Sequence, residues 1–172
     1  MPPVDRRRFL HDSAAMTASL AALTAAAGRA RADDEAKPDA KPAGPNEVIR
    51  VAVVGVRGRG LDHVGGFNKD ERTRITTICD ADRNVIGPAM KQVAARNGAE
   101  PKFVQDIRKV LDDPNIDAVS IATPNHWHSL MTIWACQAGK DVYVEKPVSH
   151  NVREGRKMVE AARKYGRVVQ TG

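Results

Sequence analysis

The chain has 172 residues, 42% of them hydrophobic, which suffices for the core of one ordinary domain and leaves no room for a second full one. The formal net charge of +6 calls for a check on nucleic-acid binding. Residues 1–32 hold five basic and two acidic side chains, and the remainder holds 22 basic and 19 acidic ones, interleaved from Lys69 to Arg167. Without a basic run or an aromatic platform, this pattern argues against a nucleic-acid partner.

The amino-terminal segment is typical of an export signal. DRRRFLH at 5–11 is followed by a mildly apolar stretch at 14–27 and by the small-residue pattern ARA at 30–32. Residues 1–32 therefore resemble a twin-arginine signal peptide, which implies export by the twin-arginine translocation machinery to the periplasm or another extracytoplasmic location. The apolar stretch is too short to span a bilayer of about 30 Å, so we expect no permanent membrane anchor. A disordered basic arm is the alternative.

The rest of the chain divides into a linker and one domain. Residues 33–46, DDEAKPDAKPAGPN, predict a disordered linker. Over residues 47–172, short β-branched runs alternate with helical patterns, which is typical of a parallel sheet with crossover helices. We predict strands at 48–54, 73–79, 102–104, 117–122, 141–144 and 167–170. The predicted fold class is α/β, a doubly wound parallel sheet of the Rossmann-like type.

Apolar stripes and capping residues mark the helices. One helix follows Asn125 and ends at Gly139, with a predicted core-facing stripe of Trp127, Met131, Trp134 and Ala138. Another runs from Asn151 to Tyr165, with Gly166 closing it and a predicted buried set of Val152, Val159 and Ala162. In segment 82–97, Pro88 either lies in the first turn of a helix that starts near Gly87 or kinks a longer helix.

The cysteines and histidines do not indicate a metal site. Cys79 and Cys136 each lie in an apolar segment without CxxC or His-rich spacing, so we interpret them as small buried hydrophobic residues. His126 and His128 are two positions apart and do not share a helix face. We therefore predict no metal ligands.

A glycine-rich run, GVRGRG, follows the first predicted strand and opens the first helix, which is the context of a phosphate-binding turn. Gly55 permits a sharp turn, while Gly58 and Gly60 keep side chains away from the pyrophosphate and the sheet. The helix N-terminus offers free N–H groups to an anion. The run departs from GxGxxG because Arg57 replaces the middle glycine. Arg57 and Arg59 are candidate phosphate contacts, with solvated loop arginines as the alternative.

Asp80 ends the second predicted strand, twenty residues after Gly60, where a carboxylate can accept hydrogen bonds from ribose hydroxyls. Its alternative role is to cap the following turn. A carboxylate there should repel a 2′-phosphate, so NAD is modestly favoured over NADP, although Arg83 lies near enough in sequence to compensate. Methyltransferases that use S-adenosylmethionine also carry glycines and an acid at these places, so these features alone do not identify a redox cofactor.

Two further motifs follow the fourth and fifth predicted strands. ATPNHWH at 122–128 and EKP at 145–147 both lie where ligands of open α/β sheets bind. Together with the glycine run, Cys79-Asp80 and the AGKDVYVEKP segment, they resemble the Gfo/Idh/MocA family over about residues 47–172. The resemblance implies a nicotinamide dinucleotide, NAD or NADP, contacted by these residues: Thr123, Pro124, Asn125, His126, Glu145, Lys146 and Pro147.

The resemblance also implies a catalytic role for Lys146, beside the nicotinamide and the reacting hydroxyl. An ammonium there can orient the oxygen and stabilise the charge that develops as a carbinol is oxidised. We expect Glu145 to orient Lys146 or the backbone and the Lys146-Pro147 bond to be cis. His126 is favoured for contact with the nicotinamide ribose, while His128 is divided evenly between site and packing.

The functional hypotheses differ in completeness and in reaction. Members of the family continue past a segment like 168–172 into an α/β substrate domain, which we expect to be absent here. The preferred hypothesis is the cofactor-binding portion of an exported oxidoreductase acting on a sugar or polyol, with substrate bound only if such a domain is supplied. The alternatives are a non-catalytic dinucleotide-binding module and a fragment of an NAD-dependent glycosidase of the same family.

Overall fold

The computed structural model describes residues 47–172, so the predicted signal peptide and linker lie outside the described residues. The six strands are β1 (Ile49–Val54), β2 (Thr73–Cys79), β3 (Lys102–Val104), β4 (Ala118–Ile121), β5 (Asp141–Val144) and β6 (Val169–Thr171). They form one sheet in the order β3-β2-β1-β4-β5-β6, and every neighbouring pair is parallel. The chain moves outward from β1 to β3 and then returns past β1 to β4. The predicted doubly wound Rossmann-like fold is confirmed.

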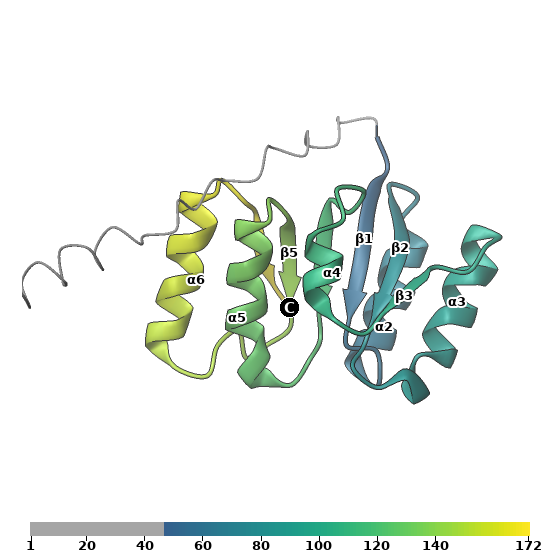
Figure 1. The fold of residues 1–172 in the computed structure, drawn as a ribbon, viewed down its shortest axis with the longest axis horizontal. Coiled ribbons are helices and arrows are strands. Elements are labelled where there is room, and N and C mark those ends of the chain that lie inside the picture. Colours follow the sequence, from purple (N-terminus) through teal and green to yellow (C-terminus); the bar gives the residue numbers. More distant parts are fainter. Residues whose placement is uncertain (1–46) are drawn as a thin grey trace, which may run out of the picture. The chain divides into compact units, whose positions relative to one another are not determined.

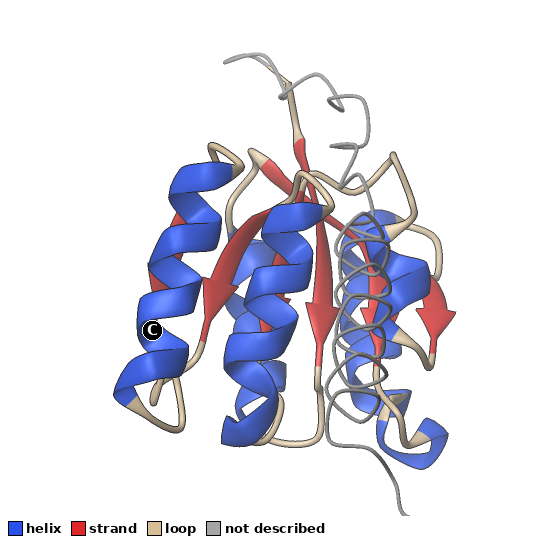
Figure 2. Cartoon of the chain, turned by 60° about the vertical axis from the view of Figure 1, so that its left-hand side comes forward, coloured by secondary structure: helices blue, strands red, loops and turns tan. Residues whose placement is uncertain are grey.

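Helices cover both faces of this sheet (Figures 1 and 2). The helices are α2 (Arg59–Lys69), α3 (Gly87–Asn97), α4 (Ile107–Leu111), α5 (Asn125–Gln137) and α6 (Val152–Lys164), with a short 3-10 turn, η1, at Arg83–Val85. The helices α2 and α3 share one hydrophobic core with the sheet, while α4, α5 and α6 share the other. The strand arrowheads visible in Figure 2 point the same way, and since all neighbouring strands are parallel, their carboxyl ends meet at one edge.

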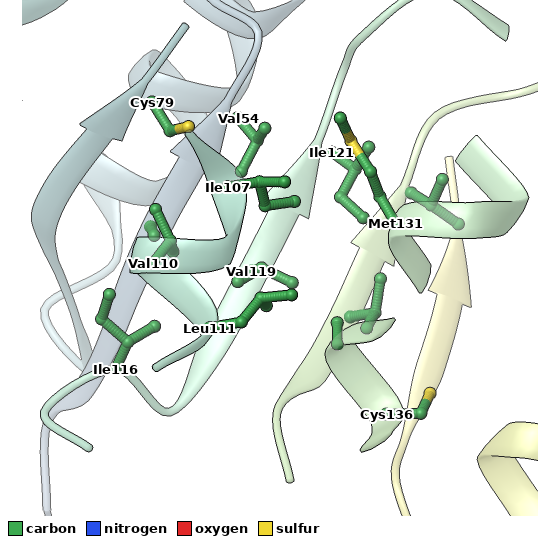
Figure 3. Close-up of a cluster of buried hydrophobic side chains, with 14 of the residues drawn as sticks. Val54, Cys79, Ile107, Val110, Leu111, Ile116, Val119, Ile121, Met131 and Cys136 are labelled. Carbon is green, nitrogen blue, oxygen red and sulfur yellow. The ribbon is translucent and has the colours of Figure 1, made fainter. Parts of the chain in front are cut away.

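Successive side chains of a strand point to opposite faces of the sheet and belong to the two cores in turn. In β1, Val51 and Val53 belong to the core under α2 and α3, whereas Ala52 and Val54 belong to the core under α4, α5 and α6. Figure 3 shows the second core, with Val54 among the buried side chains. Since strands buried on both faces need apolar residues at consecutive positions, the continuous run at 51–54 is the sequence signal of this arrangement.

The helix boundaries decide between the two alternatives for Pro88. The helix α3 begins at Gly87, and Pro88 occupies its first turn, where its missing N–H costs no helical hydrogen bond. Asn151 caps α6, because its side-chain oxygen accepts a hydrogen bond from Glu154 N–H at 2.9 Å. Gly139 closes α5 in the left-handed conformation, with φ of 73°, as predicted.

Two predicted helix faces are wrong in part. Trp127 is 40% exposed, although Met131 is buried and Trp134 and Ala138 pack against the core. The buried face of α5 is instead rotated toward polar residues, which are His128, Ser129 and Thr132. In α6, Val152 is 91% exposed and Val159 is also exposed, while Ala162 is partly buried as predicted. Met158 and Ala161 form the buried face of that helix.

The two cysteines are free and buried, as predicted. Burial raises the pKa of the Cys79 thiol to about 12 and that of the Cys136 thiol to about 11. Both side chains are therefore protonated packing groups at neutral pH. Over residues 47–172, none of the helices combines the length and apolar character needed to cross a bilayer.

Candidate functional site

The predicted site residues lie at the carboxyl edge of the sheet. Ala122 N–H donates to Val54 O at 2.8 Å, so the loop after β4 lies beside the glycine run after β1. Glu145 N–H donates to Ile121 O at 2.9 Å, which places the start of the Glu-Lys-Pro segment beside the same loop. Segments 55–60, 122–126 and 145–147 are thus brought together although they are far apart in sequence.

The glycine run forms a turn in which two positions accept only glycine. Gly55 has φ of +84°, and a Cβ there would lie 2.8 Å from Ala122 O. A Cβ on Gly60 would lie 1.7 Å from Gly55 O, so this part of α2 packs directly on the turn. At Gly58, by contrast, no heavy atom of the described residues lies within 4 Å of an ideal Cβ. Gly58 therefore faces open space.

That open space belongs to a cavity of about 820 Å³ next to the start of α2. No side chain among residues 47–172 caps this helix, so its first N–H groups are available to a ligand. Six of the predicted site residues line the cavity, namely Gly55, Arg57, Gly58, Asp80, Thr123 and Pro124. Its volume lies within the range of small-molecule and cofactor sites, about 300–1,000 Å³.

Asp80 links the glycine turn to the end of β2 through a hydrogen bond. Its Oδ2 accepts a hydrogen bond from Val56 N–H at 2.8 Å, and its Oδ1 accepts one from Asp82 N–H at 3.0 Å. Since an ionised carboxylate has about four lone-pair sites, these two bonds leave room for a ligand hydroxyl. Asp80 therefore combines the capping role with availability at the cavity.

The predicted arginines take separate positions. Arg57 lines the cavity and pairs with Asp82 at 3.5 Å. Arg83 lies in η1, where its guanidinium carbon is 5.3 Å from the centre of the Phe103 ring. Arg57 thus lies on the cavity wall, whereas Arg83 stacks on an aromatic neighbour beside β2.

A buried network holds the start of the Glu-Lys-Pro segment. Glu145 is 5% exposed, and its Oε1 accepts hydrogen bonds from Arg59 Nε at 2.6 Å and from His63 Nε2 at 3.0 Å. Its Oε2 accepts from Lys146 N–H at 3.1 Å. The bond to Arg59, followed by the one to His63, lowers the pKa of Glu145 from 4.5 to about 2. Glu145 is therefore an ionised positioning residue.

His63 completes this network and has no signal in the sequence. Its Nδ1 lies 2.8 Å from Ser120 Oγ, and its ring packs edge-on against Tyr143. Ser120, His63 and Glu145 resemble a nucleophile-base-acid arrangement, but Ser120 has no exposed surface. Since substrate cannot reach it, the arrangement serves to hold β4, β5 and α2 together.

Replacing Glu145 by glutamine is expected to lower stability by about 2 kcal/mol at neutral pH, because charge-assisted hydrogen bonds are lost. The folded-state pKa is depressed, so this stabilisation is complete above pH 4.5 and disappears as pH falls toward 2. Urea unfolding of the wild type and of Glu145→Gln, from neutral pH down to about pH 2, measures the difference in stability between them. Glu160→Gln, which removes an exposed carboxylate, is the control. A wild-type advantage that does not change with pH contradicts the assignment.

The remaining predicted residues lie around the ends of β4 and β5. Asn125 and His126 are exposed in the first turn of α5. Lys146 is exposed immediately after the Glu145 network, and the Lys146-Pro147 bond is cis, as predicted. In contrast to His126, the neighbouring His128 is 1% exposed. The two histidines therefore differ in role, and only His126 is accessible to a ligand.

The topology, the glycine turn and the cavity together define an NAD(P)-binding Rossmann domain. Comparison with known families agrees, because residues 49–172 match the family model described as "Oxidoreductase family, NAD-binding Rossmann fold". The chain belongs to this family, Gfo/Idh/MocA. The nicotinamide dinucleotide inferred from the sequence, NAD or NADP, is thereby confirmed as the cofactor class.

Among curated proteins, the chain is similar to glycosyl hydrolase family 109 protein 2 of Shewanella sp. (strain ANA-3), with 34% identity covering 94% of this chain and 38% of the relative. Among solved structures, it is similar to the WlbA dehydrogenase from Bordetella pertussis in complex with NADH and UDP-GlcNAcA. That match has a TM-score of 0.64 and 27% identity, and it covers 74% of this chain and 35% of the other.

A third similar protein is myo-inositol 2-dehydrogenase from Lactobacillus plantarum, with a TM-score of 0.63 and 26% identity. The match covers 73% of this chain and 36% of that structure. The chain spans 38% of the length of the curated relatives named glycosyl hydrolase family 109. The relatives therefore contain a large part that has no counterpart in these 172 residues.

Proposed function

We propose that residues 47–172 are the cofactor-binding part of an oxidoreductase that transfers a hydride between a nicotinamide dinucleotide and a sugar or polyol hydroxyl. One observation carries the proposal: the glycine turn, Asp80, the loop after β4 and the Glu-Lys-Pro segment share one edge of the sheet. A cavity of about 820 Å³ lies among the first three. The substrate class, a sugar or polyol, is proposed from the resemblance to the Gfo/Idh/MocA family.

The residues present fit the cofactor. The open space at Gly58 and the uncapped start of α2 suit the pyrophosphate, because a backbone without side chains can approach the anion closely. The free lone pairs of Asp80 suit the hydroxyls of the adenosine ribose. Thr123, Pro124 and His126, at the ends of β4 and α5, lie on the side nearer β5 and suit the nicotinamide half.

Lys146 is proposed to act on the substrate hydroxyl. The bound dinucleotide supplies a nicotinamide ring that accepts or donates the hydride. Glu145 accepts a hydrogen bond from the backbone N–H of Lys146, so the backbone of this exposed residue is held in place. An ammonium at this place orients the substrate oxygen and stabilises the negative charge that develops on it. Lys146 is therefore the proposed catalytic residue.

We also propose that the chain is exported and that substrate is bound by a further part of the protein. The twin-arginine pattern of residues 1–32 supports export, and the match over 94% of the chain means that the similarity to Shewanella proteins extends into residues 1–46. The coverage of 38% of those relatives supports a further domain. A full catalytic cycle needs a wall opposite Lys146 that positions the substrate.

A second candidate function keeps the cofactor and changes the reaction. The curated relatives with 31% to 34% identity are named glycosyl hydrolases. A glycosidase of this kind oxidises its substrate transiently and re-reduces it, so no net NADH accumulates. Lys146 and the dinucleotide site are needed equally in both functions, so they do not distinguish between the two.

Calorimetry with NADH on the full chain is expected to show binding, and Lys146→Met is expected to change the Kd little. In a form of the protein that contains the substrate-binding part, Lys146→Met should lower turnover by about a hundredfold or more, as loss of an oxyanion donor does. Lys69→Met, at the far end of α2, is the matched control.

The outcomes of this experiment separate the candidates. NADH release over a sugar panel supports the dehydrogenase, whereas tightly retained NAD with glycoside cleavage and no net NADH supports the glycosidase. Binding of NADH without turnover in the longer form would indicate a non-catalytic module. Absence of heat with both NADH and NADPH contradicts the proposal, and S-adenosylmethionine binding in their place would indicate a methyltransferase.

A further inference from the structure

His128 lies between two loops of the cofactor edge. It is in the first turn of α5 and is 1% exposed. Its Nε2 lies 2.7 Å from Thr123 O, in the loop after β4, and its Nδ1 lies 2.8 Å from Pro147 O, in the loop after β5. Both distances are those of hydrogen bonds. One buried side chain therefore spans two loops that come from neighbouring strands.

The chemistry of the two contacts constrains the ring. Carbonyl oxygens only accept hydrogen bonds, and a neutral imidazole carries a proton on one of its nitrogens. A neutral ring donates from one nitrogen to one of these oxygens, whereas a ring protonated on both nitrogens donates to both. In either form the imidazole fills the space between the two loops, so His128 joins them.

Each of the two loops that His128 contacts contributes to the proposed site. Thr123 lines the cavity, and its backbone nitrogen would lie 3.0 Å from a Cβ on Gly55, which shows how closely this loop packs on the glycine turn. Pro147 directly follows Lys146. The Glu145 network holds Lys146 from the α2 side, and His128 holds the same segment from the α5 side. The position of Lys146 relative to the cavity thus depends on both.

We propose that His128 is a positioning residue that fixes the Lys146-Pro147 segment against the Thr123 loop through its two ring nitrogens. The proposal rests on the dinucleotide function and assigns His128 to the nicotinamide half of the site. Loss of the two His128 contacts leaves the glycine turn and Asp80 in place, because their hydrogen bonds do not involve α5. The His128 contacts therefore determine how tightly the nicotinamide half of the dinucleotide is bound.

A graded series of variants tests this role. Leucine removes both ties, asparagine places an amide near the Nδ1 position and so keeps the Pro147 tie, and glutamine places one near Nε2 and keeps the Thr123 tie. The probes are NADH and ADP-ribose, which lacks the nicotinamide. His150→Asn is the matched control, because His150 is exposed and it donates to Glu154 Oε2 through its backbone N–H.

The expected result is a loss of NADH affinity of about tenfold for His128→Leu, with smaller losses for the Asn and Gln variants and ADP-ribose affinity unchanged in all. Equal losses for NADH and ADP-ribose, or no loss for either, overturn the proposal. If wild-type protein binds neither probe, the dinucleotide function itself fails. If His128→Leu does not fold, the Asn and Gln variants decide.

Discussion

Gly60→Ala is expected to destabilise the domain by about 3 kcal/mol or more and to abolish dinucleotide binding, as severe overpacking does. The added Cβ would lie 1.7 Å from Gly55 O, a distance that no real Cβ tolerates. The obstacle is backbone at a turn whose own φ of +84° permits little adjustment. Relief therefore requires α2 to move away from the end of β1, which separates the turn from the helix N-terminus.

Two other glycines provide matched controls for this prediction. Gly66 lies in the exposed part of α2 with no described heavy atom within 4 Å of its Cβ position, so Gly66→Ala should stabilise the domain by about 0.5–1 kcal/mol. Gly58→Ala should leave the fold intact and weaken NADH binding, because Gly58 lines the cavity. Urea unfolding and calorimetry measure all three. A Gly60→Ala protein with wild-type stability contradicts the assignment.

The sequence predicted the architecture because its strongest signals are local. Each strand is a short β-branched run, and Pro88 has one inexpensive position in a helix, which is its first turn. The parallel arrangement follows from strand-helix alternation, since parallel neighbours need a crossover between them. These signals do not depend on which residue contacts which across the fold, so they can be read from one chain.

The helix faces could not be predicted as well, because they depend on neighbours from elsewhere in the sequence. Apolar periodicity assigned Trp127 to the core, yet α5 begins at the cavity and exposes this residue. His128 takes the buried position instead, since two backbone carbonyl oxygens satisfy its ring. Val152 is similarly exposed because it lies in the first turn of α6, away from the buried Met158 and Ala161.

The site shows the same division between local and distant signals. The glycine run, Asp80 and the Glu-Lys-Pro segment were found from their place after strands, which the fold preserves. The partner of Glu145 was missed, because His63 is 82 positions away and lies in a helix with no motif. Arg59 is a candidate phosphate contact, and the sequence did not indicate that its guanidinium donates to Glu145 and to Asp62. Side-chain pairs between residues this far apart in sequence cannot be predicted from local patterns and become visible only in the folded structure.

The cavity is also expected to distinguish between NADH and NADPH. Three carboxylates line it, from Asp80, Asp82 and Asp106. Both guanidiniums on its wall are already paired, Arg57 with Asp82 at 3.5 Å and Arg108 with Asp106 at 2.6 Å. The pairing with Arg108 lowers the pKa of Asp106 to about 2, so this carboxylate is charged at neutral pH. The wall therefore presents net negative charge to any anionic group beside the ribose.

NADH is expected to bind about a hundredfold more tightly than NADPH, a difference of about 3 kcal/mol. Two like charges about 4 Å apart repel by about 1 kcal/mol in bulk water and by about 4 kcal/mol at an effective dielectric constant of about 20, so one or two carboxylates suffice. Asp82→Asn removes one carboxylate and releases Arg57, so the preference should narrow about tenfold. Asp62→Asn, which removes one of the two carboxylate partners of Arg59 outside the cavity, should leave the ratio unchanged. Competition binding with both dinucleotides measures the ratio, and equal affinity of the wild-type protein for the two would show that these carboxylates do not face the 2′ position.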